Sequence, residues 1–397
     1  MSVLLIGVLM PIFDDSIRVD HMPRKPNEVE YNFLNRSARP FFAEVRRLLT
    51  EWVGQYPSSE RNSLIKSMQA GGDQGFESGF WELYLHEAYR RSGYSITVHP
   101  EVPGSSKRPD FFMDNGESRF YLEAVKANIA AGTLAEKRRL NEVHAVLEKL
   151  PADTFKISFF YSSIGSQPLA TTMLRSQLTE WLASLNPRAV SAAYAANLSR
   201  CTLPRYQFEE EGWSLEFAAL PLRSEASGKG GPLVVTFGPR RAGGVDNVTR
   251  LTRAVDEKAK RYGKLDAPLV IAVMANTEYP TRDYQIQETL YGLSAAVPRQ
   301  ASKDPSDLHQ DGHWLTRKGW RRGHAPQVVT TSNLKPWLVA NVQPSLWTTL
   351  EPGVNIPLQP LWLAPVSVDT PEPTISRAQP INELFGLPGN WLSGDAF

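Results

Sequence analysis

The chain has 397 residues, a formal net charge of +1, 42% hydrophobic residues and 21% charged residues. This is the composition of an ordinary globular protein, with length for two to three domains or for one large domain with extensions. The near-neutral charge excludes a histone-like, strongly basic protein, so any nucleic-acid contact must come from local patches. Cys201 is the only cysteine, which excludes a disulfide framework and a cysteine-based zinc site.

An apolar run occupies residues 3–13. A membrane-spanning helix needs about 20 residues, so this run is too short to cross a bilayer. It also lacks the charged start and the small-residue cleavage site of a signal peptide. We predict a buried strand or a sticky leader, and we expect a cytoplasmic protein with no membrane partner.

Two helices and a strand are predicted in the first quarter of the chain. In residues 38–54, apolar side chains recur at i, i+3, i+4 and i+7, the spacing of an amphipathic helix. Residues 76–92 predict a second helix that ends before Gly93, a suitable C-cap. Residues 94–102 then begin as an alternating strand.

A β-hairpin is predicted next, with strands at residues 110–113 and 119–127. The sequence Asp-Asn-Gly-Glu at 114–117 is a strong turn signal. If Asn115 and Gly116 form the turn, residue 114 pairs with residue 117 and the pairing continues outward.

Two carboxylates share one face of this predicted hairpin. In the register above, Asp110 lies opposite Tyr121, and Glu123 is two residues further along on the same face. The two acids are then diagonal neighbours, about 7–8 Å apart at the backbone. Carboxylates at that separation can share one Mg²⁺ ion.

A third acid lies on the preceding helix. At about 100° per residue, Glu82 falls just past the edge of the helix's apolar arc, where it can border a cleft. Glu77 is a rival on the same helix. The alternative is that Glu82 only pairs with His86 or Arg90 along its own row.

The remaining pattern alternates helices and strands. The last predicted strand follows a helix, which suggests one more α/β unit on the same sheet. Beyond it, residues 300–326 are polar, the tail from Pro365 is extended, and residues 384–392 are a docking segment. The predicted elements are a helix at 133–150, an apolar mid-sheet strand at 154–162, a helix at 168–186, β-like segments at 206–222 and 232–237, a helix at 246–262 and a buried strand at 268–274.

These motifs resemble the PD-(D/E)xK nuclease superfamily. Arg108-Pro109-Asp110 followed by Tyr121-Leu122-Glu123 resembles its metal-binding motif, and the element order over residues 76–163 resembles its core. Residues 80–94 are similar to the first core helix of modification-dependent restriction endonucleases. The resemblance implies that Glu82 is the helix carboxylate and that Asp110 and Glu123 bind Mg²⁺ or Mn²⁺.

The lysine of the motif is displaced. The family has Glu-x-Lys, whereas this chain has Glu123-Ala124-Val125-Lys126. On a regular strand Lys126 points away from Glu123, and a one-residue bulge would return it to the site. Otherwise another cation would replace it, or the site is inactive. The candidate cations are Lys107, Arg108, Lys258 and Lys260.

We therefore predict an α/β fold with a restriction-endonuclease-like mixed central sheet flanked by helices. The expected divisions are an N-terminal helical extension at 1–72, a nuclease core at 73–275, and a C-terminal extension with a Pro-rich tail at 276–397.

The expected activity is Mg²⁺-dependent hydrolysis of phosphodiester bonds in DNA, in restriction or anti-phage defence. The alternative is a catalytically inactive module that binds nucleic acid or protein, and a homodimer or a partner protein is compatible with either. Trp314 and Trp320 interleave the basic run at 317–324, which either grips phosphates or is a solvated loop with both tryptophans packed inward. The candidate nucleic-acid contacts are Lys107, Arg108, Arg317, Lys318, Arg321 and Arg322.

Overall fold

The computed structural model describes most of the chain, in two compact units. Unit 1 comprises Met1–Arg24, Glu28–Asn128 and Asp246–Phe397, and unit 2 comprises Lys25–Asn27 and Ile129–Val245. Among the described residues, no helix has both the length and the apolar character needed to cross a membrane. The described residues are 10–25, 28–127, 131–150, 154–196, 203–222, 234–236, 247–275, 281, 283–294, 308–321, 325–351 and 379–392.

Unit 1 is built on a six-stranded mixed sheet with the order β1-β2-β3-β8-β13-β14. The first three strands are antiparallel neighbours, β8 and β13 continue parallel to β3, and β14 is antiparallel to β13. The strands are β1 (Ser95–Val98), β2 (Phe111–Asp114), β3 (Arg119–Lys126), β8 (Leu269–Ala275), β13 (Gln327–Ser332) and β14 (Ser345–Thr348).

The centre of this sheet is β8. Every residue of β8 is buried, because parallel strands on both of its sides and helices on both of its faces exclude solvent. Val270 and Met274 enter the core on one face, while Ile271 and Val273 enter the core on the other. The predicted buried strand at 268–274 thus lies in the same sheet as the hairpin.

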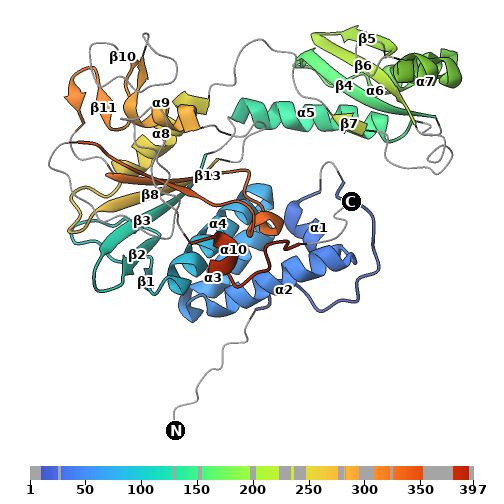
Figure 1. Cartoon of the computed structure of the whole chain (residues 1–397). Coiled ribbons are helices and arrows are strands. Elements are labelled where there is room, and N and C mark those ends of the chain that lie inside the picture. The colour runs from blue at the N-terminus through green and yellow to red at the C-terminus, as the bar shows by residue number, and fades with distance from the viewer. Residues whose placement is uncertain are drawn as a thin grey trace. The chain divides into compact units, whose positions relative to one another are not determined.

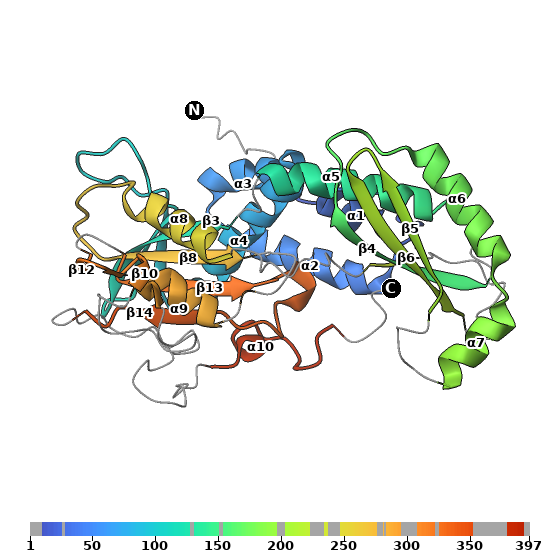
Figure 2. The ribbon, with the colours of Figure 1, turned by 90° about the horizontal axis from the view of Figure 1, so that it is seen from above.

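Helices cover both faces of the sheet (Figure 1). On one face α4 crosses the sheet, where the indole Nε1 of Trp81 donates to the Ala272 carbonyl at 2.9 Å. On the other face α8 lies over β3 and β8 (Figure 2). The first group is α1 (Glu30–Arg36), α2 (Pro40–Gln55), α3 (Ser58–Ala70) and α4 (Gly72–Arg91); the second is α8 (Asn247–Ala259) and α9 (Asp283–Tyr291).

Helices α3 and α4 pack closely because of a glycine. A Cβ added to Gly79 would come within 2.5 Å of the Met68 side chain. Both Met68 and Gly79 belong to the buried interior. The helical region predicted at the N-terminus therefore packs as part of the core on the α4 face.

The C-terminal segment also enters this core. Phe385 follows α10 (Ile381–Leu384) and packs against Trp52 and Tyr84, with ring centroids 4.7 and 5.2 Å apart. The Arg91 guanidinium donates to the Phe385 carbonyl at 2.9 Å. The described part of the predicted docking segment therefore packs on α2 and α4.

Four short strands and a 3₁₀ helix complete the described part of unit 1. Strands β9 and β10 form one two-stranded ribbon, and β11 and β12 form another. The elements are β9 (Leu293–Ser294), β10 (Leu308–Gln310), β11 (Leu315–Thr316), β12 (Gly319–Trp320) and η3 (Pro336–Leu338).

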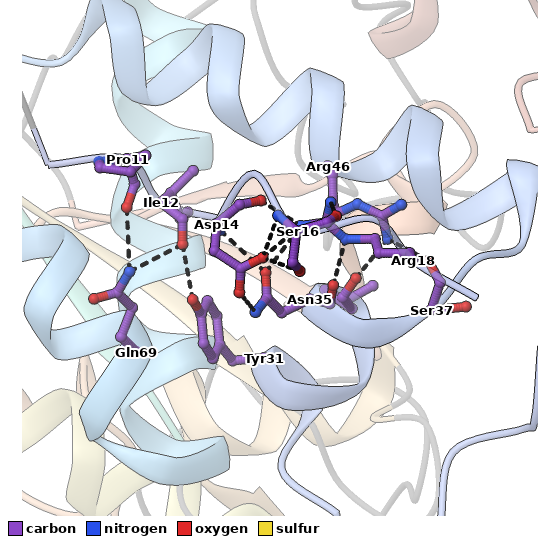
Figure 3. A network of polar contacts seen from close by, with 11 residues as sticks. Pro11, Ile12, Asp14, Ser16, Arg18, Tyr31, Asn35, Ser37, Arg46 and Gln69 are labelled. Carbon is purple, nitrogen blue, oxygen red and sulfur yellow. Dashed lines mark hydrogen bonds and ion pairs between the residues drawn. The ribbon is translucent and has the colours of Figure 1, made fainter. Parts of the chain in front are cut away.

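An extended N-terminal segment is fixed to α1 and α3 by hydrogen bonds of side chains (Figure 3). Gln69 and Tyr31 both donate to the Ile12 carbonyl, at 3.0 Å each. Arg18 donates to the Asn35 side chain at 3.1 Å. Ile12 is buried, whereas residues 3–9 of the predicted apolar run lie outside the described residues.

Unit 2 has its own four-stranded sheet, with the order β5-β6-β4-β7. Its core is formed by apolar residues of the sheet together with those of α5 and α6. The elements are α5 (Ala131–Leu147), β4 (Phe155–Ser163), α6 (Thr171–Ser184), α7 (Pro187–Ala196), β5 (Arg205–Glu210), β6 (Trp213–Pro221) and β7 (Val234–Thr236).

The placement of one predicted strand was wrong. The resemblance over residues 76–163 assigned the strand at 154–162 to the hairpin's sheet, but that strand is β4 and pairs with β6 and β7. The parallel neighbour of β3 is β8. An apolar run predicts a buried strand without saying which sheet it joins, which is the reason for the error. The divisions at residues 72 and 275 stay a prediction.

A chain of buried charges joins α1, α4, β3 and the segment after β13. Lys335 Nζ lies 2.8 Å from Glu30 Oε2 and 2.6 Å from Glu77 Oε1, and Lys126 pairs with the other oxygen of Glu77. Glu30 is 1% exposed. Burial raises the pKa of Glu30, and the charge of Lys335 acts against that rise. These charges are compensated only as a group.

We predict that Lys335→Met lowers the free energy of unfolding by about 3 kcal/mol, because Glu30 and Glu77 lose the cation they share. Chemical denaturation at pH 7 measures this. Lys318→Met, at an exposed position, is the control and should change stability by less than about 0.5 kcal/mol. Equal losses in the two variants would contradict the role given to the buried charges.

Candidate active site

The hairpin β2–β3 has a longer turn than the sequence predicted. Asp114 pairs with Arg119, and Phe112 pairs with Tyr121. The loop is Asn115 to Ser118. The Asn115 side chain accepts from the backbone N–H of Ser118 at 2.7 Å, and the backbone N–H of Asn115 donates to the Ser118 carbonyl. The predicted pairing of residue 114 with residue 117 was therefore wrong by two residues.

This register moves Asp110 closer to Glu123. The last pair of the ladder is Phe111 with Leu122, so the next residue on each strand is Asp110 and Glu123. Asp110 lies directly across from Glu123 and not across from Tyr121. Its Oδ2 accepts the Ala124 N–H at 2.7 Å, which fixes the carboxylate against β3. A shift of two residues keeps the same face.

Glu123 is enclosed by donors from the end of α8. The side chain is 1% exposed. Its Oε1 accepts from Lys258 Nζ and from Arg261, at 3.4 Å for the latter, and its Oε2 accepts from the Tyr262 hydroxyl. A buried carboxylate needs such partners to remain charged.

Glu82 completes a group of three acids. It is partly exposed on α4. Burial, followed by the charges of Asp110 and Glu123, raises the pKa of Glu82 to about 8. Burial and the charge of Glu123 raise the pKa of Asp110 to about 6, although the Ala124 N–H and Lys258 act the other way. The acids repel one another, which is an arrangement that favours a cation or a shared proton.

Lys126 is not beside these acids. The ladder of β3 with β8 runs without a bulge from Tyr121 to Lys126, so Lys126 points to the face opposite Glu123. There it pairs with Glu77 of α4. The bulge that would have brought Lys126 back to the site is absent from this strand.

Of the other predicted cations, Lys258 contacts Glu123. Lys260 is 68% exposed, and its ammonium lies 3.8 Å from Asp256. Lys107 is exposed, and Arg108 pairs with Glu101 at 2.6 Å. Lys258 is therefore the predicted substitute cation that the fold brings to the acids.

The predicted phosphate contacts of the basic run are placed differently. Arg317 is exposed and pairs with Asp311 at 3.1 Å, and Lys318 is exposed. Arg321 pairs with Asp256 and is largely enclosed. Trp314 is fully buried and Trp320 is partly buried, as in the reading with tryptophans packed inward. Arg322 lies outside the described residues.

The acids supply the hard oxygen donors that Mg²⁺ prefers. Mg²⁺ is usually held by one or two carboxylates together with water and substrate oxygens, so Asp110 and Glu123 fit such a role. In the described part of the chain, no three His, Cys, Asp or Glu side chains are close enough to hold a metal ion among them. The donor set thus fits a metal that keeps several non-protein ligands.

Two residues of this site were missed by sequence reasoning. Arg261 and Tyr262 contact Glu123 together with Lys258, at spacings i, i+3 and i+4. The spacing itself was visible, because it places three polar groups on one side of a helix. Which strand that side would face was not visible.

Comparison of the chain with protein-family models, with curated proteins and with solved structures finds no match in any of the three.

We predict that Glu82→Gln stabilises the chain at alkaline pH. The pKa of Glu82 is 4.5 in the unfolded chain and about 8 in the folded chain. Between these pH values the folded chain binds a proton that the unfolded chain has lost, so the folded state loses stability as the pH rises through them. At pH 9 the free energy of unfolding of the variant should exceed that of the wild type by on the order of 2 kcal/mol. Near pH 4.5 the two should differ little. Denaturation across this pH range measures the slope.

Glu77→Gln, on the same helix, is the matched control with the opposite sign. Burial opposes the charge of Glu77, but Lys335 and Lys126 outweigh it and hold the pKa below its usual value. Glu77 therefore stabilises the fold above about pH 4.5, and its replacement should destabilise at pH 7. If Glu82→Gln also destabilised at pH 9, the predicted mutual repulsion of the acids would be wrong.

Proposed function

We propose that this chain is a Mg²⁺-dependent nuclease with a restriction-endonuclease-like core that hydrolyses phosphodiester bonds of DNA. The observation that carries the proposal is the pairing of Asp110 with Glu123 across a hairpin, with Glu82 beside them and Lys258 on Glu123. This is a set of acids and one cation of the kind that metal-assisted phosphodiester hydrolysis uses. A role in restriction or anti-phage defence accords with this chemistry.

The arrangement of elements supports the proposal. Helix α4 is followed by β1, by the β2–β3 hairpin, by α8 and by β8 parallel to β3. This is the order that the PD-(D/E)xK resemblance implied, with α8 and β8 in place of the helix and strand expected at 133–162. The Ile129–Val245 part of unit 2 lies between β3 and α8 in the chain.

Each residue has a role in the proposed reaction. Asp110 and Glu123 would hold the ion, which when bound polarises the scissile phosphate and lowers the pKa of a water. The Lys258 ammonium forms an ion pair with Glu123, where its charge can orient that water or offset charge on the phosphorane. Glu82 would hold a second ion or its water shell. These roles replace the one predicted for Lys126.

Exposed cations offer contacts for the phosphate backbone. Lys107 precedes Asp110 in the chain, and Lys260 directly follows the last residue of α8. Both side chains are exposed. A net charge of +1 makes such local contacts the source of affinity, and binding through them weakens as salt rises.

A second candidate function is supported by the contacts of Glu123. Both of its oxygens already accept from Lys258, Arg261 or Tyr262, so its charge is compensated by the protein itself. In a catalytically inactive module for nucleic-acid or protein binding, these contacts of Glu123 would serve stability alone.

We predict that purified protein cuts plasmid or single-stranded DNA with Mg²⁺ or Mn²⁺. Asp110→Ala, Glu123→Ala and Lys258→Met should each lower the rate by at least about 100-fold, because each removes charge from the reacting centre. Lys126→Met is the matched lysine control and should retain cutting within a few-fold, since its side chain contacts Glu77.

Two outcomes would contradict this assignment. No cutting of any substrate, together with no metal binding, would favour the inactive module. Loss of cutting in Lys126→Met with full activity in Lys258→Met, both folded by circular dichroism, would show that the wrong lysine was chosen.

A further inference from the structure

A single turn at the end of α8 supplies every described partner that the side chain of Glu123 has. Lys258 begins this turn, and Arg261 and Tyr262 follow three and four residues later. A turn follows Ala259, the last residue of α8, in which the Arg261 N–H donates to the Lys258 carbonyl at 3.1 Å. The three side chains converge on Glu123 of β3.

The two carboxylate oxygens of Glu123 accept from different kinds of donor. Both cations approach Oε1, whereas among the described residues Oε2 accepts from the Tyr262 hydroxyl alone. The exposed fractions of Lys258 and Arg261 are 27% and 42%, so both side chains reach solvent. Tyr262 is 4% exposed and packs in the core beneath α8. The tyrosine is thus the partner of the carboxylate that surrounding side chains enclose.

The hydroxyl of Tyr262 donates to Glu123 and carries no charge of its own. A neutral donor on one oxygen restrains rotation of the carboxylate without neutralising its charge.

We propose that Tyr262 is a positioning residue whose hydroxyl fixes the Glu123 carboxylate in the orientation that binds a divalent cation with Asp110. This inference rests on the proposed function. It assigns to Tyr262 a contribution to metal affinity, and not to the chemical step.

The same strand contains a matched control. Tyr121 lies two residues before Glu123 on the same face of β3, and it is 5% exposed. Its hydroxyl donates to Asp266 Oδ1 at 2.9 Å and not to Glu123. Tyr121→Phe and Tyr262→Phe therefore remove the same atom from similarly buried rings, but only one of them touches the carboxylate.

The experiment measures Mn²⁺ binding by electron paramagnetic resonance for the wild type and both variants. Tyr262→Phe should weaken Mn²⁺ affinity by about 10-fold or more, the size of effect found when a partner of a metal ligand is removed. Tyr121→Phe should stay within about 2-fold. In cleavage assays Tyr262→Phe should need about 10-fold more metal for half-maximal rate and regain a wild-type rate at saturation.

The outcomes separate this inference from the proposed function. If the wild type binds Mn²⁺ and Tyr262→Phe binds it equally well, the positioning role is overturned and the proposed function stands. If Tyr121→Phe weakens binding as much as Tyr262→Phe, the effect is general to the core and the inference is overturned. If the wild type binds no Mn²⁺, both the metal site and this inference are overturned.

Discussion

The parallel pairing of β3 with β8 is the constraint on which the rest of unit 1 depends. Parallel strands cannot be joined by a tight turn, so the chain must leave the end of β3 and return over the sheet. The return path includes Ile129–Val245 of unit 2 and ends with α8, which packs on β3 and β8. The donors that surround Glu123 come from this crossover. The same pairing thus forms the core and completes the acidic site.

The alternation of side chains along β3 divides the charges between two environments. Glu123 faces α8 and is compensated by Lys258, while Lys126 faces α4 and is compensated by Glu77. The lysine is three positions after the acid, and an odd number of positions along a regular strand puts two side chains on opposite faces. The spacing Glu-x-x-Lys therefore leaves the lysine of β3 away from the acid, and Lys258 of α8 contacts the acid instead.

The acids of this region also differ in whether neighbouring charges stabilise or oppose their ionised form. On the α4 side, Glu77 lies between two lysines that stabilise its charge, as expected of a structural ion pair. Around Glu123, in contrast, Glu82 of α4 and Asp110 lie near other acids, and burial together with those charges raises the pKa of both. Perturbed acids of this kind are a common property of sites that act on ligands. The contrast within α4, between Glu77 and Glu82, distinguishes a structural carboxylate from a candidate functional one.

The sequence alone determined several of the local elements and the facing acids. Periodicity predicted α2 and α4, the turn signal predicted the β2–β3 hairpin, and alternation put Asp110 and Glu123 on one face; an even register error of two residues leaves that result intact. Only the tertiary structure decided which strand lies beside β3, that Lys126 pairs with Glu77, and that Arg261 and Tyr262 reach Glu123. The physical reason is that periodicity reports which side of an element is buried, whereas the partner across a sheet or beneath a helix depends on packing between segments that are far apart in the chain.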